Sequence, residues 1–394
     1  MKQISYFSFF QMLLFVSCTA KAPLSGIIKL PSDGNWASMV YLVQPRTFDE
    51  VAASFSGQVL DSAAILTDGS FAFKKMPEAI EPVLLELVIQ RKGERFFNKL
   101  ENEELTTANY FPFVWKNGDR LEVTASADQF QRSFSIKNPS PENAALLHLR
   151  DVRLKAFQQL QQKSGTQGHD ESLLLEEEAA RLRFQQASMD FAKETEHLLP
   201  ALVAIRWVSP ANDYERVPEF LVSQCEKWQN KNTGHPWVAQ LCQKSNREQL
   251  PVLKGDQMPD AMLPMLSGGE SALYQLLGER LTILDLWASW CAPCRRENRD
   301  FLAPLWDRYH EQGLQIIGYA LEGSEAAWKN AIEKDGANRW LHASPLQGDD
   351  APLLKTLRIQ TIPSNFLLDA QGKVLAKNLH GEELVKFVEE YLGR

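Results

Sequence analysis

The last third of the chain, residues 250–394, alternates apolar runs with amphipathic stretches. The runs LTILDL (281–286) and LQIIGYAL (314–321) are almost continuously apolar, as strands buried in a parallel sheet must be. Shorter strand-like runs cover 365–369 and 374–377, and helix-like segments cover 293–311, 324–335, 350–357 and 382–392. Strand–helix alternation of this length predicts one α/β domain.

The first two-thirds of the chain show two other patterns. Residues 24–137 contain short apolar and β-branched runs, including ASMVYLVQ (37–44) and VLLELVIQR (83–91), separated by turn sequences such as Asp68-Gly69. This spacing predicts a β-sandwich-like domain. Residues 138–249 repeat apolar positions at helical spacing, which predicts a helical domain. Its later helices are expected at 195–207, 213–229 and 236–248.

Residues 1–17 have the features of an export signal: a positive charge at Lys2 is followed by an apolar run. That run is too short to span a bilayer but suits the core of a signal peptide. The core ends at FVSC (15–18), which resembles a bacterial lipobox with Cys18 as the lipidated residue. Residues 18–23 then form a short tether. Ordinary cleavage after Ala20 is the alternative. Either reading predicts a mature chain in the cell envelope, facing the periplasm, where disulfides persist.

Composition narrows the classes of function. The 394 residues are 44% hydrophobic and 23% charged, which is ordinary for a globular protein. The formal net charge is −8, and no run of Lys and Arg is interleaved with aromatic residues, so no nucleic-acid partner is expected. The seven histidines are scattered, and we expect neither a metal nor an organic cofactor. Five cysteines are too few for a disulfide scaffold, which leaves the spacing Cys291-x-x-Cys294 to be explained.

Two cysteines three positions apart at the start of a helix bring both sulfur atoms within bonding reach. The N-terminus of a helix stabilises a thiolate, so Cys291 is expected to be the nucleophile and the more buried Cys294 the resolving thiol. Arg295 and Arg296 are expected to add positive charge nearby. Pro293 suits the first helical turn, where its missing N–H is not needed.

Three alternatives compete for this spacing. A zinc site needs two further ligands, and the nearest downstream histidines, His310 and His342, are not at a suitable spacing. Attachment of a c-type haem needs histidine where Arg295 stands. A purely structural local disulfide is the third alternative.

The surrounding sequence resembles a known family. The run LDLWASWCAPCR (284–295) resembles the active-site strand and helix start of thioredoxin, and with Glu297 it resembles the membrane-anchored thiol–disulfide reductases of the TlpA/ResA type. GDQMPD (255–260) and TIPSNFLLD (361–369) extend the resemblance over about 250–394. It implies a thioredoxin fold for this part. Arg299 departs from the family, which usually has proline there, and this puts the usual kink of the active-site helix in doubt.

A weaker resemblance covers part of the β-rich segment. VLDS (59–62) and DGSFAF (68–73) are similar to sequences in the small N-terminal β-domain of many Gram-negative thioredoxin-like lipoproteins. That domain has no established function, and this segment carries no catalytic constellation of its own.

The resemblance implies roles for two carboxylic acids. Asp285 matches the buried acid of thioredoxin, whose pKa is raised by apolar surroundings and which relays a proton to or from the resolving thiol, here Cys294. The alternative is a solvated aspartate at a strand end. Glu297 matches the glutamate near the active site of TlpA/ResA-type proteins, and its alternative is an ordinary charge on a helix surface.

The resemblance also implies a substrate-binding edge. Pro363 matches the cis-proline that faces the dithiol, and the backbone of Ile362 could pair with an extended substrate. Trp290 and Pro293 are further candidates for substrate contact. Trp287, with Trp290, could shape the substrate surface, and the alternative for both is that they are tryptophans in the core of an α/β domain.

Cys225 and Cys242 form the remaining pair once Cys18 is assigned to the lipid. In an oxidising compartment they could form a structural disulfide between adjacent helices. Two buried free thiols, or a second redox pair that passes electrons to the CAPC motif, are the alternatives.

Together these features predict an exported, lipid-anchored thiol–disulfide oxidoreductase that reduces disulfides of envelope proteins and is recharged by an upstream thiol donor. A binding module that uses the thioredoxin fold only as a scaffold is one alternative, and the intact motif with Asp285 and Pro363 argues against it. A thiol peroxidase is another, but the Pro-x-x-x-Thr-x-x-Cys setting of a peroxidatic cysteine is absent.

Overall fold

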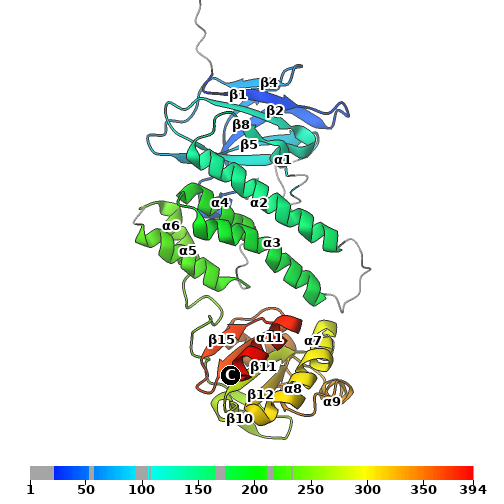
Figure 1. Cartoon of the computed structure of the whole chain (residues 1–394). Helices are drawn as coiled ribbons and strands as arrows, with labels where there is room; N and C mark the ends of the chain where they lie inside the picture. Colours follow the sequence, from blue (N-terminus) through cyan, green and yellow to red (C-terminus); the bar gives the residue numbers. More distant parts are fainter. Residues whose placement is uncertain are drawn as a thin grey trace, which may run out of the picture.

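The computed structural model describes residues 22–52, 57–94, 105, 108–164, 174–210, 214, 216–231 and 234–393. The predicted signal segment and Cys18 lie outside these ranges. Figure 1 shows three layers along the molecule: a β-rich part, a group of helices in the middle, and an α/β part at the C-terminal end. Within the described ranges, no helix combines the length and apolar character needed to cross a bilayer.

The β-rich part contains two four-stranded sheets. Their orders are β4-β1-β7-β8 and β3-β2-β5-β6, and all neighbours are antiparallel except β1 and β7. The strands are β1 (Leu24–Lys29), β2 (Trp36–Gln44), β3 (Gln58–Ala64), β4 (Ser70–Phe73), β5 (Val83–Arg91), β6 (Tyr110–Trp115), β7 (Leu121–Ser126) and β8 (Ser135–Ile136), with the short helix α1 (Phe130–Ser133) before β8. Both sheets contribute to one hydrophobic core.

Among the described residues, the helical layer contains five helices, whose buried side chains belong to the same hydrophobic cluster as those of the β-rich part. They are α2 (Pro141–Ser164), α3 (Leu174–Glu194), α4 (Leu198–Val208), α5 (Pro218–Asn230) and α6 (Pro236–Lys244). Both α5 and α6 begin with a proline, which fits a first turn because its amide would have no intrahelical partner. The sequence pattern placed the start of α5 too early, at 213.

Buried polar contacts join the helices to the sheets. Asn143 of α2 makes two hydrogen bonds with the backbone of Val114 in β6, accepting from its amide at 2.8 Å and donating to its carbonyl at 2.9 Å. Trp207 of α4 donates to the hydroxyl of Tyr110 at 2.8 Å. One cluster of buried hydrophobic side chains includes residues from Leu24 in β1 to Leu250. The segments predicted as separate domains, 24–137 and 138–249, therefore share one core.

The C-terminal part has its own core around a five-stranded sheet. Its order is β13-β12-β11-β14-β15, with β12 parallel to β11 and β13, and β14 antiparallel to β11 and β15. The strands are β11 (Leu281–Trp287), β12 (Leu314–Ala320), β13 (Leu341–Ala343), β14 (Ser364–Asp369) and β15 (Val374–Lys377), and a hairpin of β9 (Met262–Pro264) and β10 (Glu270–Ala272) precedes them. Every residue of the central strand β11 is buried, as its apolar sequence predicts.

The helices of this part follow the predicted alternation. They are α7 (Ala292–Glu297), α8 (Ala303–Tyr309), α9 (Glu325–Lys334), α10 (Pro352–Leu357) and α11 (Gly381–Leu392). The single helix predicted over 293–311 is interrupted by a π-helical turn, Asn298–Leu302. The active-site helix is therefore irregular at Arg299 although no proline stands there, and such π-turns occur often at functional sites.

Candidate active site

The two cysteines of the CAPC sequence form a disulfide just beyond the carboxyl end of β11. Cys291 is the N-cap residue of α7, and its Sγ accepts a hydrogen bond from the amide of Cys294 at 3.3 Å. Their Cα atoms lie 5.3 Å apart. Cys291 is 6% exposed and Cys294 2%, so the first cysteine is the more accessible one. Pro293 occupies the first turn, as predicted.

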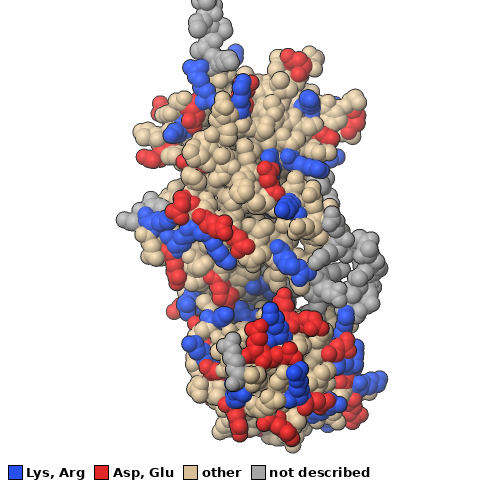
Figure 2. Space-filling view, in the orientation of Figure 1, with Lys and Arg blue, Asp and Glu red and all other residues tan. Residues whose placement is uncertain are grey.

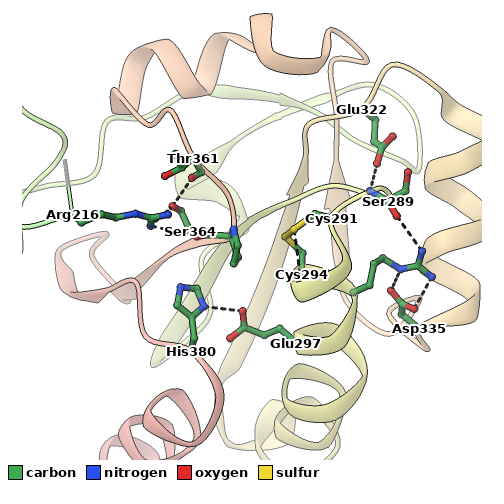
Figure 3. Close-up of a disulfide and its surroundings, with 12 residues drawn as sticks. Arg216, Ser289, Cys291, Cys294, Glu297, Glu322, Asp335, Thr361, Ser364 and His380 are labelled. Atoms are coloured by element: carbon green, nitrogen blue, oxygen red, sulfur yellow. Dashed lines mark hydrogen bonds and ion pairs between the residues drawn. A yellow bond between two sulfur atoms is a disulfide. The ribbon is translucent and has the colours of Figure 1, made fainter. Parts of the chain in front are cut away.

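A cis-proline loop lies at the same edge of the sheet as the disulfide. The peptide bond between Ile362 and Pro363 is cis. The loop leads into β14, which runs antiparallel to β11 with Ser364 opposite Leu286, so the start of β14 lies at the end of β11. Figure 3 shows Ser364 and the disulfide on neighbouring segments of this edge.

The two candidate tryptophans differ in their surroundings. Trp290, directly before Cys291, is 63% exposed, so it is available to a substrate. Trp287 is fully buried and packs edge-on against His342, with ring centroids 6.0 Å apart. Trp287 therefore belongs to the core, and the suggestion that it shapes the substrate surface is wrong.

Two acids lie buried near the disulfide. Burial, and after it the charge of Glu297, raises the pKa of Asp285 well above its ordinary value. Glu297 is buried as well and accepts hydrogen bonds from Nδ1 of His380 at 2.8 Å and from the amide of Gly381 at 3.3 Å, both at the start of α11. Neither acid is a solvated surface group. Figure 3 shows Glu297 and His380 facing one another below the disulfide.

Three arginines near the dithiol share two carboxylate partners, which compensate part of their positive charge. Asp335, at the end of α9, accepts from Arg295 at 2.7 Å and from Arg299 at 3.0 Å, and its own side chain is 1% exposed. Arg296 pairs with Asp300 at 3.4 Å. The positive charge expected beside Cys291 is therefore present, and carboxylates compensate part of it.

A buried glutamate holds the turn before the cysteines. The carboxylate of Glu322, which follows β12, accepts a hydrogen bond from the amide of Ser289, and Arg295 donates to the carbonyl of the same serine at 3.2 Å. Both contacts fix the backbone two residues before Cys291. Figure 3 shows Glu322 and Asp335 on this side of the disulfide.

One contact near the site comes from outside the C-terminal part. Arg216, in the turn before α5, donates to the carbonyl of Pro363 at 3.4 Å and to the hydroxyl of Ser364 at 3.2 Å. Sequence reasoning missed this arginine, as it missed Glu322, Asp335 and His380. A polar residue before a predicted helix could have drawn attention to His380; the other three carry no local signal.

The second pair of cysteines is also bonded in the structure. Cys225 of α5 and Cys242 of α6 form a disulfide with Cα atoms 5.0 Å apart, across the two adjacent helices. Because the pair lies in the helical layer that shares its core with the β-rich part, a structural role suits it. Among the described residues, no group of three or more His, Cys, Asp and Glu side chains is placed to hold a metal ion.

Comparison with known proteins assigns the chain to a family. Residues 254–377 match the AhpC/TSA family. The thiol-disulfide oxidoreductase ResA of Geobacillus thermodenitrificans is 32% identical over 128 residues, which cover 32% of this chain and 70% of that protein. This chain belongs to the ResA-type thiol-disulfide oxidoreductase family. The predicted oxidoreductase activity and the thioredoxin-like fold of the C-terminal part are thereby confirmed.

Other proteins that are similar to this chain carry the same or related names. ResA of Bacillus thuringiensis is 28% identical over 141 residues, covering 36% of this chain and 77% of that protein. Among solved structures, the thioredoxin domain of a thiol-disulfide oxidoreductase from Bacteroides vulgatus is 27% identical and covers 36% of this chain and 99% of that one, with a TM-score of 0.33. Each similarity covers about a third of the chain, so the upstream parts and their boundaries stay predictions.

Proposed function

We propose that this protein is an exported, lipid-anchored enzyme that reduces disulfides of envelope proteins through Cys291 and Cys294. The observation that carries the proposal is the pairing of a helix-capping Cys291 with a buried partner thiol at the edge where the cis-proline loop begins. The family supplies the reaction class, thiol–disulfide exchange. The envelope location is supported by the signal-like segment, and the second disulfide suits an oxidising compartment.

The reaction begins with the reduced dithiol. The thiolate of Cys291 attacks one sulfur of the substrate disulfide, which forms a mixed disulfide and releases the other substrate sulfur as a thiolate. That thiolate takes up a proton from water. The amide of Cys294, which donates to Sγ of Cys291, and the dipole of α7 favour the Cys291 thiolate over the thiol.

Resolution of the mixed disulfide uses the buried thiol. Cys294 gives its proton to the carboxylate of Asp285 and attacks Sγ of Cys291, which expels the second substrate thiolate. The raised pKa of Asp285 suits it to accept this proton and release it later. Two electrons pass from the dithiol to the substrate, and the enzyme is left as the Cys291–Cys294 disulfide. An upstream thiol donor in the envelope then returns two electrons by the reverse exchange.

Trapping of the mixed disulfide tests the proposal. The Cys294→Ser variant lacks the resolving thiol and should accumulate envelope proteins disulfide-linked to Cys291, visible as reducible bands and identifiable by mass spectrometry. The Cys291→Ser/Cys294→Ser variant is the matched control and should trap none. If the single variant traps nothing in cells while its Cys291 still reacts with a small disulfide, the assignment of protein substrates is wrong.

A further inference from the structure

The cis-proline loop is held from outside the C-terminal part. Nη1 of Arg216 donates to the carbonyl of Pro363 and to Oγ of Ser364, at 3.4 and 3.2 Å. The Ser364 hydroxyl in turn donates a hydrogen bond to the carbonyl of Thr361 at 2.8 Å. One guanidinium therefore reaches both sides of the proline, directly at its carbonyl and through the hydroxyl at Thr361. Figure 3 shows Arg216 approaching Ser364 from the side away from the disulfide.

A second set of contacts fixes the segment that carries this arginine. Glu219, in the first turn of α5, pairs with Lys377 of β15 at 3.0 Å and accepts from the amide of Lys254 at 2.9 Å. Lys377 also donates to the carbonyl of Val252 at 3.0 Å. Lys377 stands opposite Phe366 in β14, close to the start of that strand. The start of α5 is thus tied to the same end of the sheet from which the cis-proline loop emerges.

The loop has a chemical reason to need such support. Proline has no N–H, so Pro363 cannot donate a backbone hydrogen bond. Thr361 is exposed, and Ile362 and Pro363 are only half-buried. A charged donor at the Pro363 carbonyl forms a stronger hydrogen bond than a neutral one would.

We propose that Arg216 is a positioning residue of the oxidoreductase site, through which the helical layer holds the cis-proline loop in the conformation that receives a polypeptide substrate. This inference rests on the proposed function, since it takes the loop to be the substrate-binding edge. Arg216 acts through Pro363 and Ser364 and takes no part in the sulfur chemistry. Its loss should therefore weaken recognition of a polypeptide and leave the reactivity of the dithiol unchanged.

The test compares two substrates with the full-length protein. Insulin serves as the polypeptide disulfide and DTNB, an aromatic disulfide reagent, as the small one. We expect Arg216→Met to raise KM for insulin by about tenfold, with kcat within about twofold of the wild-type value. The rate with DTNB and the equilibrium constant with glutathione should stay within about twofold. Arg216→Lys should recover part of the loss, because lysine keeps a charged donor but not the planar fork.

A matched control separates this effect from general weakening of the contact between the two parts. Arg247→Met removes an ion pair with Asp256, 2.8 Å long, that also joins the helical layer to the C-terminal part but lies away from the loop. Its kinetics should equal those of the wild type. Ser364→Ala removes one acceptor of Arg216 from the other side of the contact and should raise KM for insulin in the same direction.

The outcomes are distinct. A KM for insulin that is unchanged in both Arg216→Met and Ser364→Ala, or a rise that Arg247→Met reproduces, would overturn the positioning role. If Arg216→Met does not fold, as judged by circular dichroism, Ser364→Ala and Arg216→Lys decide by the same KM criterion. Wild-type protein that reacts with DTNB but reduces no insulin would contradict the premise that this edge receives a general polypeptide, and this inference with it, whereas the proposed function is decided by the trapping experiment with Cys294→Ser.

Discussion

Asp285 carries a carboxyl group that is almost completely buried in the central strand, next to Glu297. Burial raises its pKa above the ordinary value of about 3.8. Between that value and the raised one, the folded protein holds a proton that the unfolded chain has lost. The free energy of unfolding therefore falls as pH rises through this window and stays lower above it. A group of this kind lowers stability while supplying a proton acceptor to Cys294.

Asp285→Asn should separate these two effects. We expect resolution of the mixed disulfide to slow by about a hundredfold, the scale of general base catalysis. Urea unfolding at a series of pH values should show the variant losing less stability than the wild type between mildly acidic and alkaline pH. Asp307→Asn, an exposed carboxylate paired with Arg339, serves as control and should change neither. Equal pH slopes for wild type and Asp285→Asn would contradict the raised pKa.

The residues that could be predicted from the sequence lie within short contiguous motifs. Cys291, Cys294 and Asp285 fall within twelve consecutive residues, 284–295, and Pro363 lies beside a recognisable strand. Arg216 and Asp335 act from distant positions, and a single charged residue in a helical segment has no local pattern that distinguishes it from a solvated one. Only the fold brings them to the site.

At the scale of elements, α9 contributes to the redox centre through Asp335, the residue at its C-cap. Asp335 holds Arg295 of α7 and Arg299 of the π-turn, so α9 compensates charge beside the dithiol. Positive charge near a thiolate stabilises the reduced form and makes a dithiol more oxidising. The intervening pair Ala292-Pro293 also lacks the histidine that strongly oxidising relatives commonly carry. Both features favour a reducing potential.

We therefore expect a potential nearer thioredoxin's roughly −270 mV than DsbA's roughly −120 mV, measured by equilibration with glutathione. Asp335→Ala should shift it by roughly 10 to 20 mV in the oxidising direction, because the arginine charges are then uncompensated. Asp300→Ala removes the exposed partner of Arg296 and should leave the potential within about 5 mV of the wild-type value, because an exposed ion pair contributes little. A wild-type potential above about −160 mV would overturn the reductase assignment.

The second disulfide joins the helices α5 and α6 and should stabilise the fold. Cys225 and Cys242 are separated by 17 residues in sequence, and closing such a loop contributes about 3 kcal/mol in the chain-entropy model. Cys225→Ala/Cys242→Ala should lower the free energy of unfolding by about that amount, measured with urea, and should leave the rate with DTNB unchanged. Peptide mapping without reductant should find the bridge. Free labelling of both thiols in the native wild type would show that the bridge is absent.

The strand β6 is not among the strand-like runs that the sequence pattern predicts, and the reason lies in its composition. Its sequence, YFPFVW, contains Pro112, and a proline within an apolar run argues against a central strand. The structure places β6 at the edge of its sheet, where a missing N–H is tolerated. Asn143 of α2 pairs with the backbone of Val114 at that edge. Residues 110–115 therefore form a strand because their place at the sheet edge tolerates Pro112, and the sequence alone does not show that place.

At the scale of the whole molecule, one hydrophobic core extends to Leu250 and a second begins at Met258, and the sequence pattern gives no sign that the β-rich and helical segments share the first of them. Periodicity reports which face of an element is buried, not which partner covers it. Acidic and basic side chains are interspersed over the face in Figure 2, including the region where the helical layer meets the C-terminal part. The ion pair of Glu219 with Lys377 is one contact between the helical layer and the C-terminal part.

Anchoring is the remaining property of the whole molecule, and it rests on the segment FVSC (15–18). If Cys18 carries lipid, acyl chains inserted in a bilayer hold the two folded parts at a membrane through a tether of a few residues. Cys18→Ser should then move the protein from the membrane fraction to the soluble one, or leave an unprocessed precursor, whereas Ser17→Ala keeps a small residue before the cysteine and should change neither. Fractionation combined with the mass of the mature N-terminal peptide measures both outcomes. A wild-type protein in the soluble fraction whose first residue is Lys21 would instead establish cleavage after Ala20 and remove the anchor from the proposed function.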